Sequence, residues 1–220
     1  RSGDLYQFKS RYAQKTLGCT GFAAVEPFDK WDQVYDSMPL VPSTLDVLLY
    51  YWHTYSRARA EYPRNVIKAL AGDSLRTLGT YRAARTHLQR AQQFFAARRD
   101  AAPDPTLVDE YLFECRRLIA VVDAYEAILA GLRQARMALG APGERAGLEG
   151  AAGRLQQALQ GFDAMMACAE QVKRPYLLPQ LLRDLSKLRG YLADLAAATA
   201  AAAENAEAAG RLRKMLADVD

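Results

Sequence analysis

The sequence predicts an all-α protein, built from antiparallel helical hairpins that stack as a short solenoid and end in a long Ala-rich helix. Alanine occupies 40 of the 220 positions. Together with Leu, Arg, Gln and Glu, it loses little side-chain freedom in a helix. No segment alternates apolar and polar residues for long enough to predict a β-sheet. A chain of this length can bury a sizeable core without a disulfide or metal.

Glycine and proline separate the helices predicted in the first half. A short amphipathic helix is expected over 5–17, and a loop bounded by Gly18, Gly21 and Pro27 follows it. The apolar side of this first helix consists of Leu5, Phe8, Tyr12 and Leu17. Further helices are predicted over 28–38, 44–60, 64–79 and 81–99. The last of these carries one apolar stripe, made of Tyr81, Ala84, Leu88, Ala91 and Phe95.

In the second half, residues 106–139 have a continuous helical pattern after Pro103 and Pro105. Because 34 helical residues in a row are unusual in a compact domain, a break is expected near 121–123. The remaining elements are a Gly-rich loop over 140–150, an amphipathic helix over 154–171 and a long helix over 176–219. Beyond Leu195 the last helix is almost pure alanine with charges. It is expected to be an exposed arm, a partner-docking helix or a frayed end.

These elements divide the chain into four parts. They are an N-terminal helix and loop (1–27), helical hairpins (28–139), the Gly-rich linker (140–150) and a C-terminal hairpin with the Ala-rich tail (151–220). No run of about 18 uncharged apolar residues occurs, so we expect no membrane insertion. The chain begins at Arg1 without Met, which we interpret as removal of a targeting peptide or truncation.

The residues that commonly carry catalysis or bind metals are few. Cys19, Cys115 and Cys168 are far apart and odd in number, which predicts reduced core thiols rather than disulfides or a zinc site. His53 and His87 are the only histidines; the first is interpreted as a packed residue and the second as a residue of a solvent face. No acid–base constellation or phosphate loop is present. The prediction is therefore a non-enzymatic protein with no catalytic residue, no cofactor and no metal.

Three segments resemble the pentatricopeptide (PPR) repeat, a hairpin of two helices. The phrase YDSMP (35–39) resembles the end of a PPR helix, and Tyr55 matches the tyrosine of the next unit. Pro103 and Asp104 match the proline–aspartate that opens a unit. The third segment matches the core of a second helix through Ala158, Leu159, Phe162, Asp163 and Met165. The resemblance covers about half of the chain and implies stacked hairpins, each burying an apolar face against its neighbour.

The positions at which PPR proteins read RNA bases are lost. The resemblance places these positions at Leu49, at Asp109 and near Pro179. An apolar side chain, a carboxylate and a proline cannot supply the hydrogen bonds that read a base edge. We therefore do not expect base-coded RNA recognition.

Between Arg57 and Arg99, ten basic residues face only two acidic ones. A GC-rich genome would produce the same Arg bias, and a solvated face or RNA phosphate contacts are open alternatives. Because aromatic residues alternate with these arginines, we favour docking to another protein. The candidate partner-binding residues are Arg57, Arg59, Tyr62, Arg82, Arg85 and Arg90. The acidic residues Asp109, Glu110 and Glu114 are expected to pair with Arg116, Arg117 or other nearby arginines.

Size, helical hairpins and lost base-reading positions are similar to those of small PPR-like proteins attached to the catalytic head of the euglenozoan mitochondrial ATP synthase. The resemblance implies a structural accessory subunit of a large mitochondrial complex in the matrix, with other protein subunits as partners. The alternative is an organellar RNA-binding or mitoribosome-associated PPR-like protein.

Overall fold

The computed structural model describes residues 2–37, 64, 67, 68, 74–140, 144–170 and 178–219. The helices among them are α1 (Ser2–Leu17), α2 (Phe22–Ser37), α5 (Ser74–Arg98), the 3-10 helix η1 (Arg99–Ala101), α6 (Pro105–Ala138), α7 (Glu144–Glu170), α8 (Leu178–Ala202) and α9 (Ala206–Ala217). No β-strand occurs in this part of the chain, which confirms the prediction of an all-α protein.

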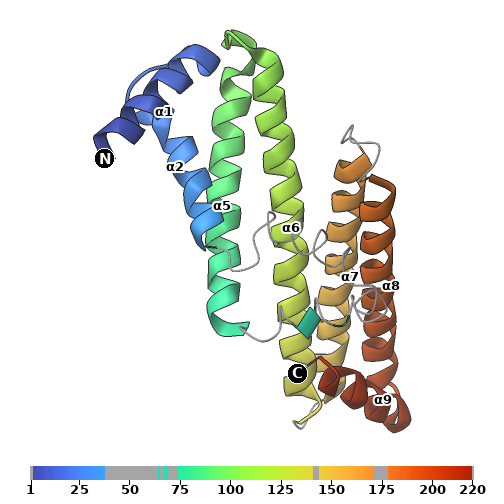
Figure 1. The fold of residues 1–220 in the computed structure, drawn as a ribbon. Coiled ribbons are helices and arrows are strands. Elements are labelled where there is room, and N and C mark those ends of the chain that lie inside the picture. Colours follow the sequence, from blue (N-terminus) through green and yellow to red (C-terminus); the bar gives the residue numbers. More distant parts are fainter. Residues whose placement is uncertain are drawn as a thin grey trace.

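The described helices stand side by side in chain order (Figure 1). Helices α5, α6, α7 and α8 form a row, α1 and α2 pack at the side of α5, and α9 turns back at the lower end of the row. The most extensive contacts join consecutive helices, above all α6 with α7. This arrangement is consistent with a helical-repeat fold, while the regular repeats of a solenoid remain a prediction.

Helix α1 ends in a glycine cap. Gly18 adopts a φ of 66°, which disfavours residues with a side chain, and its N–H donates to the Gln14 carbonyl at 3.1 Å. Pro27 does not lie in the following loop as predicted, because α2 begins at Phe22 and includes it. Proline removes one backbone hydrogen bond from a helix. The burial of Ala24 and Val25 in the preceding turn offsets this loss.

Helix α5 confirms the predicted apolar stripe. Tyr81, Ala84, Leu88, Ala91 and Phe95 are all buried, with exposed fractions of 2% or less. The predicted helix end at Gly79 is wrong, because α5 runs through this residue from Ser74.

The predicted break near 121–123 is also wrong, since α6 is continuous over 34 residues. Its middle is buried on several sides at once: the consecutive residues Val121 and Val122 are both buried, as are Ala124 and Tyr125. A helix that packs between two neighbours is apolar nearly all round. The contacts of α5 on one side and α7 on the other therefore stabilise the long helix.

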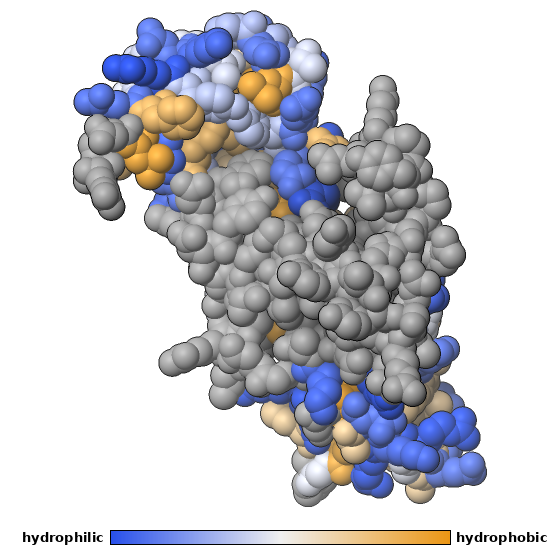
Figure 2. Space-filling view, in the orientation of Figure 1, coloured by the Kyte–Doolittle hydropathy of each residue, from blue (hydrophilic) through white to orange (hydrophobic). Residues whose placement is uncertain are grey.

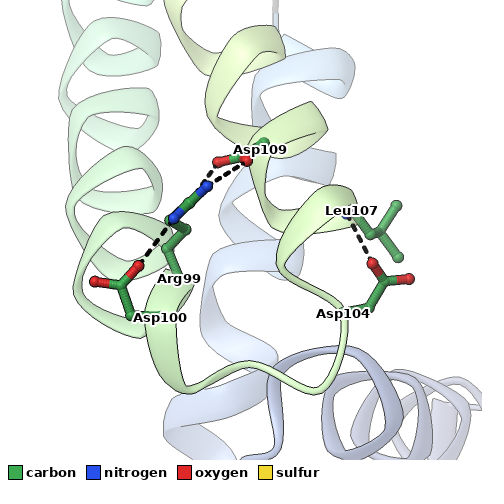
Figure 3. Close-up of polar contacts among 5 residues, drawn as sticks. All are labelled: Arg99, Asp100, Asp104, Leu107 and Asp109. Carbon is green, nitrogen blue, oxygen red and sulfur yellow. Dashed lines mark hydrogen bonds and ion pairs between the residues drawn. The ribbon is translucent and has the colours of Figure 1, made fainter.

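A polar corner joins α5 to α6 (Figure 3). The guanidinium of Arg99 binds Asp109 through two hydrogen bonds of 2.9 Å and contacts Asp100 at 3.0 Å. The side chain of Asp104 caps α6 by accepting a hydrogen bond from the Leu107 N–H at 3.1 Å. The two-pronged contact with Arg99 holds the pKa of Asp109 below its usual value. These bonds fix the turn between α5 and α6.

Residues 144–150 are helical rather than part of a Gly-rich linker. Helix α7 begins at Glu144, and Leu148 is fully buried. The glycines here allow close packing: a Cβ added at Gly147 would lie 2.7 Å from the Ala138 Cβ. The sequence pattern of glycines thus reflects close contact between α6 and α7.

The Ala-rich tail does not continue as one exposed helix. It turns at Ala203 and Glu204, and Asn205 starts α9 by accepting a hydrogen bond from the Ala208 N–H at 2.8 Å. Helix α9 then packs back onto α8 and buries Leu212 and Leu216. The prediction of a single helix over 176–219 is therefore wrong, because Asn205 caps a new helix inside the alanine run.

The buried residues form two clusters. The larger one extends over α5, α6, α7, α8 and α9, and the smaller one joins α1 and α2 to α5 and the start of α6. Phe28 is the centre of the smaller cluster, with its ring 5.7–5.9 Å from those of Tyr12, Phe95 and Tyr111. Rings at such distances contribute beyond the area that they bury. These contacts hold the first two helices against the row.

Candidate functional site

The predicted partner-binding residues are divided between described and undescribed parts of the chain. Arg57, Arg59 and Tyr62 lie outside the described residues, as do His53 and Tyr55. Arg82, Arg85 and Arg90 lie on α5 and are exposed.

Two of these arginines are engaged within the fold. Arg82 Nε donates to Glu126 Oε1 at 2.6 Å. Arg85 Nε lies 3.0 Å from Asp123 Oδ1, but its N–H does not point at this buried oxygen, which has no hydrogen bond in the described part of the chain. Burial raises the pKa of Asp123, although the charge of Arg85 acts in the opposite direction. Both contacts reduce the positive charge that α5 offers to a partner.

An open groove of about 730 Å³ runs along α6, between α5 and α7. We call it the α6 groove. Small residues occupy part of its lining, among them Ala120, Ala127 and Gly161. Its polar residues include the two carboxylates already described, together with Arg85, Arg116, Arg154 and three glutamines, Gln92, Gln157 and Gln160. Cavities of this volume are large enough for ligands.

The arginines of the α6 groove differ in their contacts. Arg154 Nε donates to the neutral amide oxygen of Gln134 at 3.2 Å. In the described part of the chain, neither Arg116 nor Arg154 has a carboxylate within 4 Å. Both side chains belong to exposed residues. Unlike Arg82 and Arg85, neither guanidinium group lies against a carboxylate among the described residues, although the charge of Arg116 contributes to lowering the pKa of Asp109.

A second candidate surface lies at the N-terminal end. Leu5, Tyr6 and Phe8 on α1 have exposed fractions of 54%, 41% and 65%. We call these three residues the α1 patch. In Figure 2, hydrophobic side chains gather over the region where α1 and α2 lie. Of the four residues predicted to form the apolar side of α1, Leu17 is buried and Tyr12 is half-buried, whereas Leu5 and Phe8 are exposed.

Other reactive side chains do not gather into a site in the described part of the chain. Cys115 is a free buried thiol whose pKa is raised by burial to about 12, and Cys19 is free and half-buried. No group of three potential metal ligands occurs among the described residues. None of the described helices has the length and hydropathy needed to cross a membrane. Of the acidic residues predicted to pair with nearby arginines, Glu114 binds Arg117 and Asp109 binds Arg99.

His87 is half-buried rather than part of a solvent face, and its Nδ1 has no hydrogen bond to the described residues. Burial is the main cause that lowers the pKa of His87, and the charges of Lys30 on α2 and Arg90 on α5 lower it further. The folded state therefore resists protonation. The stability that this neutral imidazole provides is present above its unfolded pKa of about 6.5 and is lost as the pH falls below that value.

We expect the free energy of unfolding to decrease between about pH 7 and pH 5, and to decrease less in the variant His87→Gln. Urea unfolding at several pH values measures both slopes. The raised pKa of Asp123 acts in the opposite direction, because its contribution to stability increases as the pH falls. The difference in pH dependence between the parent and His87→Gln therefore isolates the contribution of His87. Equal slopes for the two proteins would contradict the role of His87.

Comparison of the chain with family models, curated proteins and solved structures finds no match. The candidate function therefore depends on the α1 patch and the α6 groove. The sequence predicted Arg116 only as a partner of Asp109, Glu110 or Glu114, none of whose carboxylates lies within 4 Å of its guanidinium, and it did not indicate Arg154 or the three glutamines. A helical-spacing signal was available for the α7 residues, since Arg154, Gln157 and Gln160 recur every third position, but the facing helix is not evident from the sequence.

Proposed function

We propose that this protein is a non-catalytic structural subunit that docks onto another protein through the α1 patch. The observation that supports the proposal is the exposure of Leu5, Tyr6 and Phe8 within about one turn of α1. Contiguous exposed apolar side chains mark interaction sites on soluble domains. Aromatic side chains are also enriched among the residues that dominate binding energies.

The surroundings of the α1 patch suit a protein partner. Lys9 forms an ion pair with Asp29 at 2.6 Å, which ties α1 to α2. The hydroxyls of Tyr12 and Tyr111 are hydrogen-bonded, and this contact ties α1 to α6. Arg11 and Lys15 are exposed further along α1. An apolar centre on a fixed helix with a polar rim is the usual composition of a protein interface.

The resemblance to PPR-like proteins favours one partner in particular, the catalytic head of a mitochondrial ATP synthase. The role would then be that of an accessory subunit in the mitochondrial matrix. The RNA-binding alternative receives less support, because Arg82 and Arg85 are paired with Glu126 and Asp123. Phosphate contacts require cations that are free to replace counterions.

Affinity purification of the tagged full chain under native conditions tests the proposal. We expect a protein complex to be retained, and the double variant Leu5→Ser/Phe8→Ser to lose it. Complete burial of one such side chain contributes about 1.5–3 kcal/mol, and a partner can bury only the exposed parts of Leu5 and Phe8, 54% and 65%, so removal of both should weaken binding by at least about 20-fold. Mass spectrometry of the retained proteins distinguishes ATP synthase subunits from ribosomal ones.

The matched control is Phe22→Ser. Phe22 is 72% exposed but belongs to α2, on the far side of the turn that ends α1. We expect this variant to retain the partner, and the circular dichroism of all variants to match that of the parent. Equal retention by the double variant and the parent would refute docking through the α1 patch. Retention of RNA without protein would favour the alternative function.

A further inference from the structure

The α6 groove is a second surface, separate from the α1 patch, and its charges are arranged unevenly. Its two carboxylates, Asp123 and Glu126, each face an arginine of α5. Arg116 and Arg154, in contrast, have no carboxylate within 4 Å in the described part of the chain. The positive charge that remains for a ligand is therefore located on these two side chains.

Arg116 and Arg154 lie toward opposite ends of the groove. The lining residues of α6 extend from Arg116 to Ala127, which at about 1.5 Å per residue corresponds to about 16 Å. Arg154 contacts Gln134, farther along α6 in the same direction. Gln134 lies 18 residues after Arg116, which is about 27 Å along α6, and an extended polypeptide covers this distance with roughly eight residues. The spacing thus suits a short segment with an acidic residue near each end.

The rest of the lining suits a polypeptide backbone. The small side chains of Ala120 and Ala127 leave room for main-chain atoms to approach α6 closely. The amides of Gln92 and Gln157 can donate to and accept from peptide groups.

From this arrangement we propose that the α6 groove binds an acidic segment of a partner protein, with its carboxylates on Arg116 and Arg154. Arginine binds carboxylates through planar, two-pronged hydrogen bonds. A nucleic acid fits less well, because Asp123 and Glu126 lie in the same groove and reduce the net charge of the lining to +1. A phosphate backbone would place several negative charges along these carboxylates.

Fluorescence anisotropy with the full chain tests the inference. The probe is a labelled peptide of about ten residues, extended at about 3.3 Å per residue, with Glu near both ends and Ala, Gly and Ser between them. Its reference is the same peptide with Gln in place of Glu. At low salt, where screening is weak, we expect the Glu peptide to bind at least about tenfold more tightly.

The variants Arg116→Glu and Arg154→Glu should each weaken binding of the Glu peptide by about tenfold or more. The matched control is Arg211→Glu, which makes the same charge change on the exposed face of α9, where Arg211 lies 3.7 Å from Glu207. We expect this control to bind like the parent. Circular dichroism checks that all three variants keep their helix content.

Several results would overturn the inference. They are equal binding of the Glu and Gln peptides, no binding of the Glu peptide by the parent, and an equal loss in the Arg211→Glu control. Tighter binding of an oligouridine that competes with the peptide would assign the groove to nucleic acid instead. Since binding of this peptide does not involve the α1 patch, failure here leaves the proposed docking through α1 unaffected.

Discussion

Replacing Phe162 with alanine is expected to lower the free energy of unfolding by about 3–5 kcal/mol. Phe162 is fully buried in the larger core cluster, on the helix that packs between α6 and α8. Removal of its ring loses the burial of the apolar surface and leaves a cavity that close-packed neighbours fill only in part. Urea unfolding followed by circular dichroism measures the change.

Phe22→Ala provides the control for this experiment. Phe22 is 72% exposed, so the same loss of a ring should change the free energy of unfolding by less than about 0.5 kcal/mol. A loss below about 1 kcal/mol for Phe162→Ala would show that α7 is not packed between its two neighbours as described.

Gly161→Leu is expected to destabilise the protein by about 3 kcal/mol or more, at the upper end of the effects of overpacking. Even a Cβ at this position would lie 2.8 Å from the Ala124 Cβ and 3.0 Å from its Cα and N. Because two of these atoms belong to the backbone of α6, the clash cannot be relieved by a side-chain rotation. The two helices would have to separate.

The same substitution at Gly153 tests this explanation. Gly153 is exposed on α7, eight positions earlier, and a Cβ there would meet nothing within 4 Å. Leucine has the higher helix propensity, so Gly153→Leu should raise the free energy of unfolding by about 0.5–1 kcal/mol. Thermal or urea unfolding of both variants should therefore give changes of opposite sign. Equal effects would attribute both to helix propensity rather than to the contact between α6 and α7.

The local sequence pattern was sufficient for the helices and for much of the core. The spacing of Tyr81, Leu88 and Phe95 predicted a buried stripe that the structure confirms. The amphipathic helix predicted over 154–171 likewise buries Leu155 and Phe162. Such predictions succeed because apolar residues at helical spacing form one face regardless of what covers it.

Helix ends were predicted less well. Gly79 does not end a helix, and residues 121–123 do not interrupt one. Glycines interpreted as a linker allow α6 and α7 to approach each other, and Asn205 divides the C-terminal helix in two. Each error has the same cause: a glycine, a run of apolar residues or a short polar residue has several structural meanings, and the neighbouring helix selects one.

The candidate site was predicted only in part. Arg82 and Arg85 were selected for their positive charge, yet each faces a carboxylate on α6 that lies about 40 positions away in the sequence. Arg116 and Arg154 were not selected, although they are the arginines of the groove without such a partner. Composition records how many charges a segment has, but pairing depends on which helices become neighbours.

The sequence by itself determined the helical class of this protein and the apolar faces of α5 and α7, because helix propensity and periodicity act within a few residues. The tertiary structure decided where helices end, which arginines are neutralised and which apolar side chains stay exposed on α1. These properties depend on contacts between residues far apart in the chain. Packing of one helix against another stabilises additional helical turns, and it pairs charged side chains that would otherwise stay free on the surface.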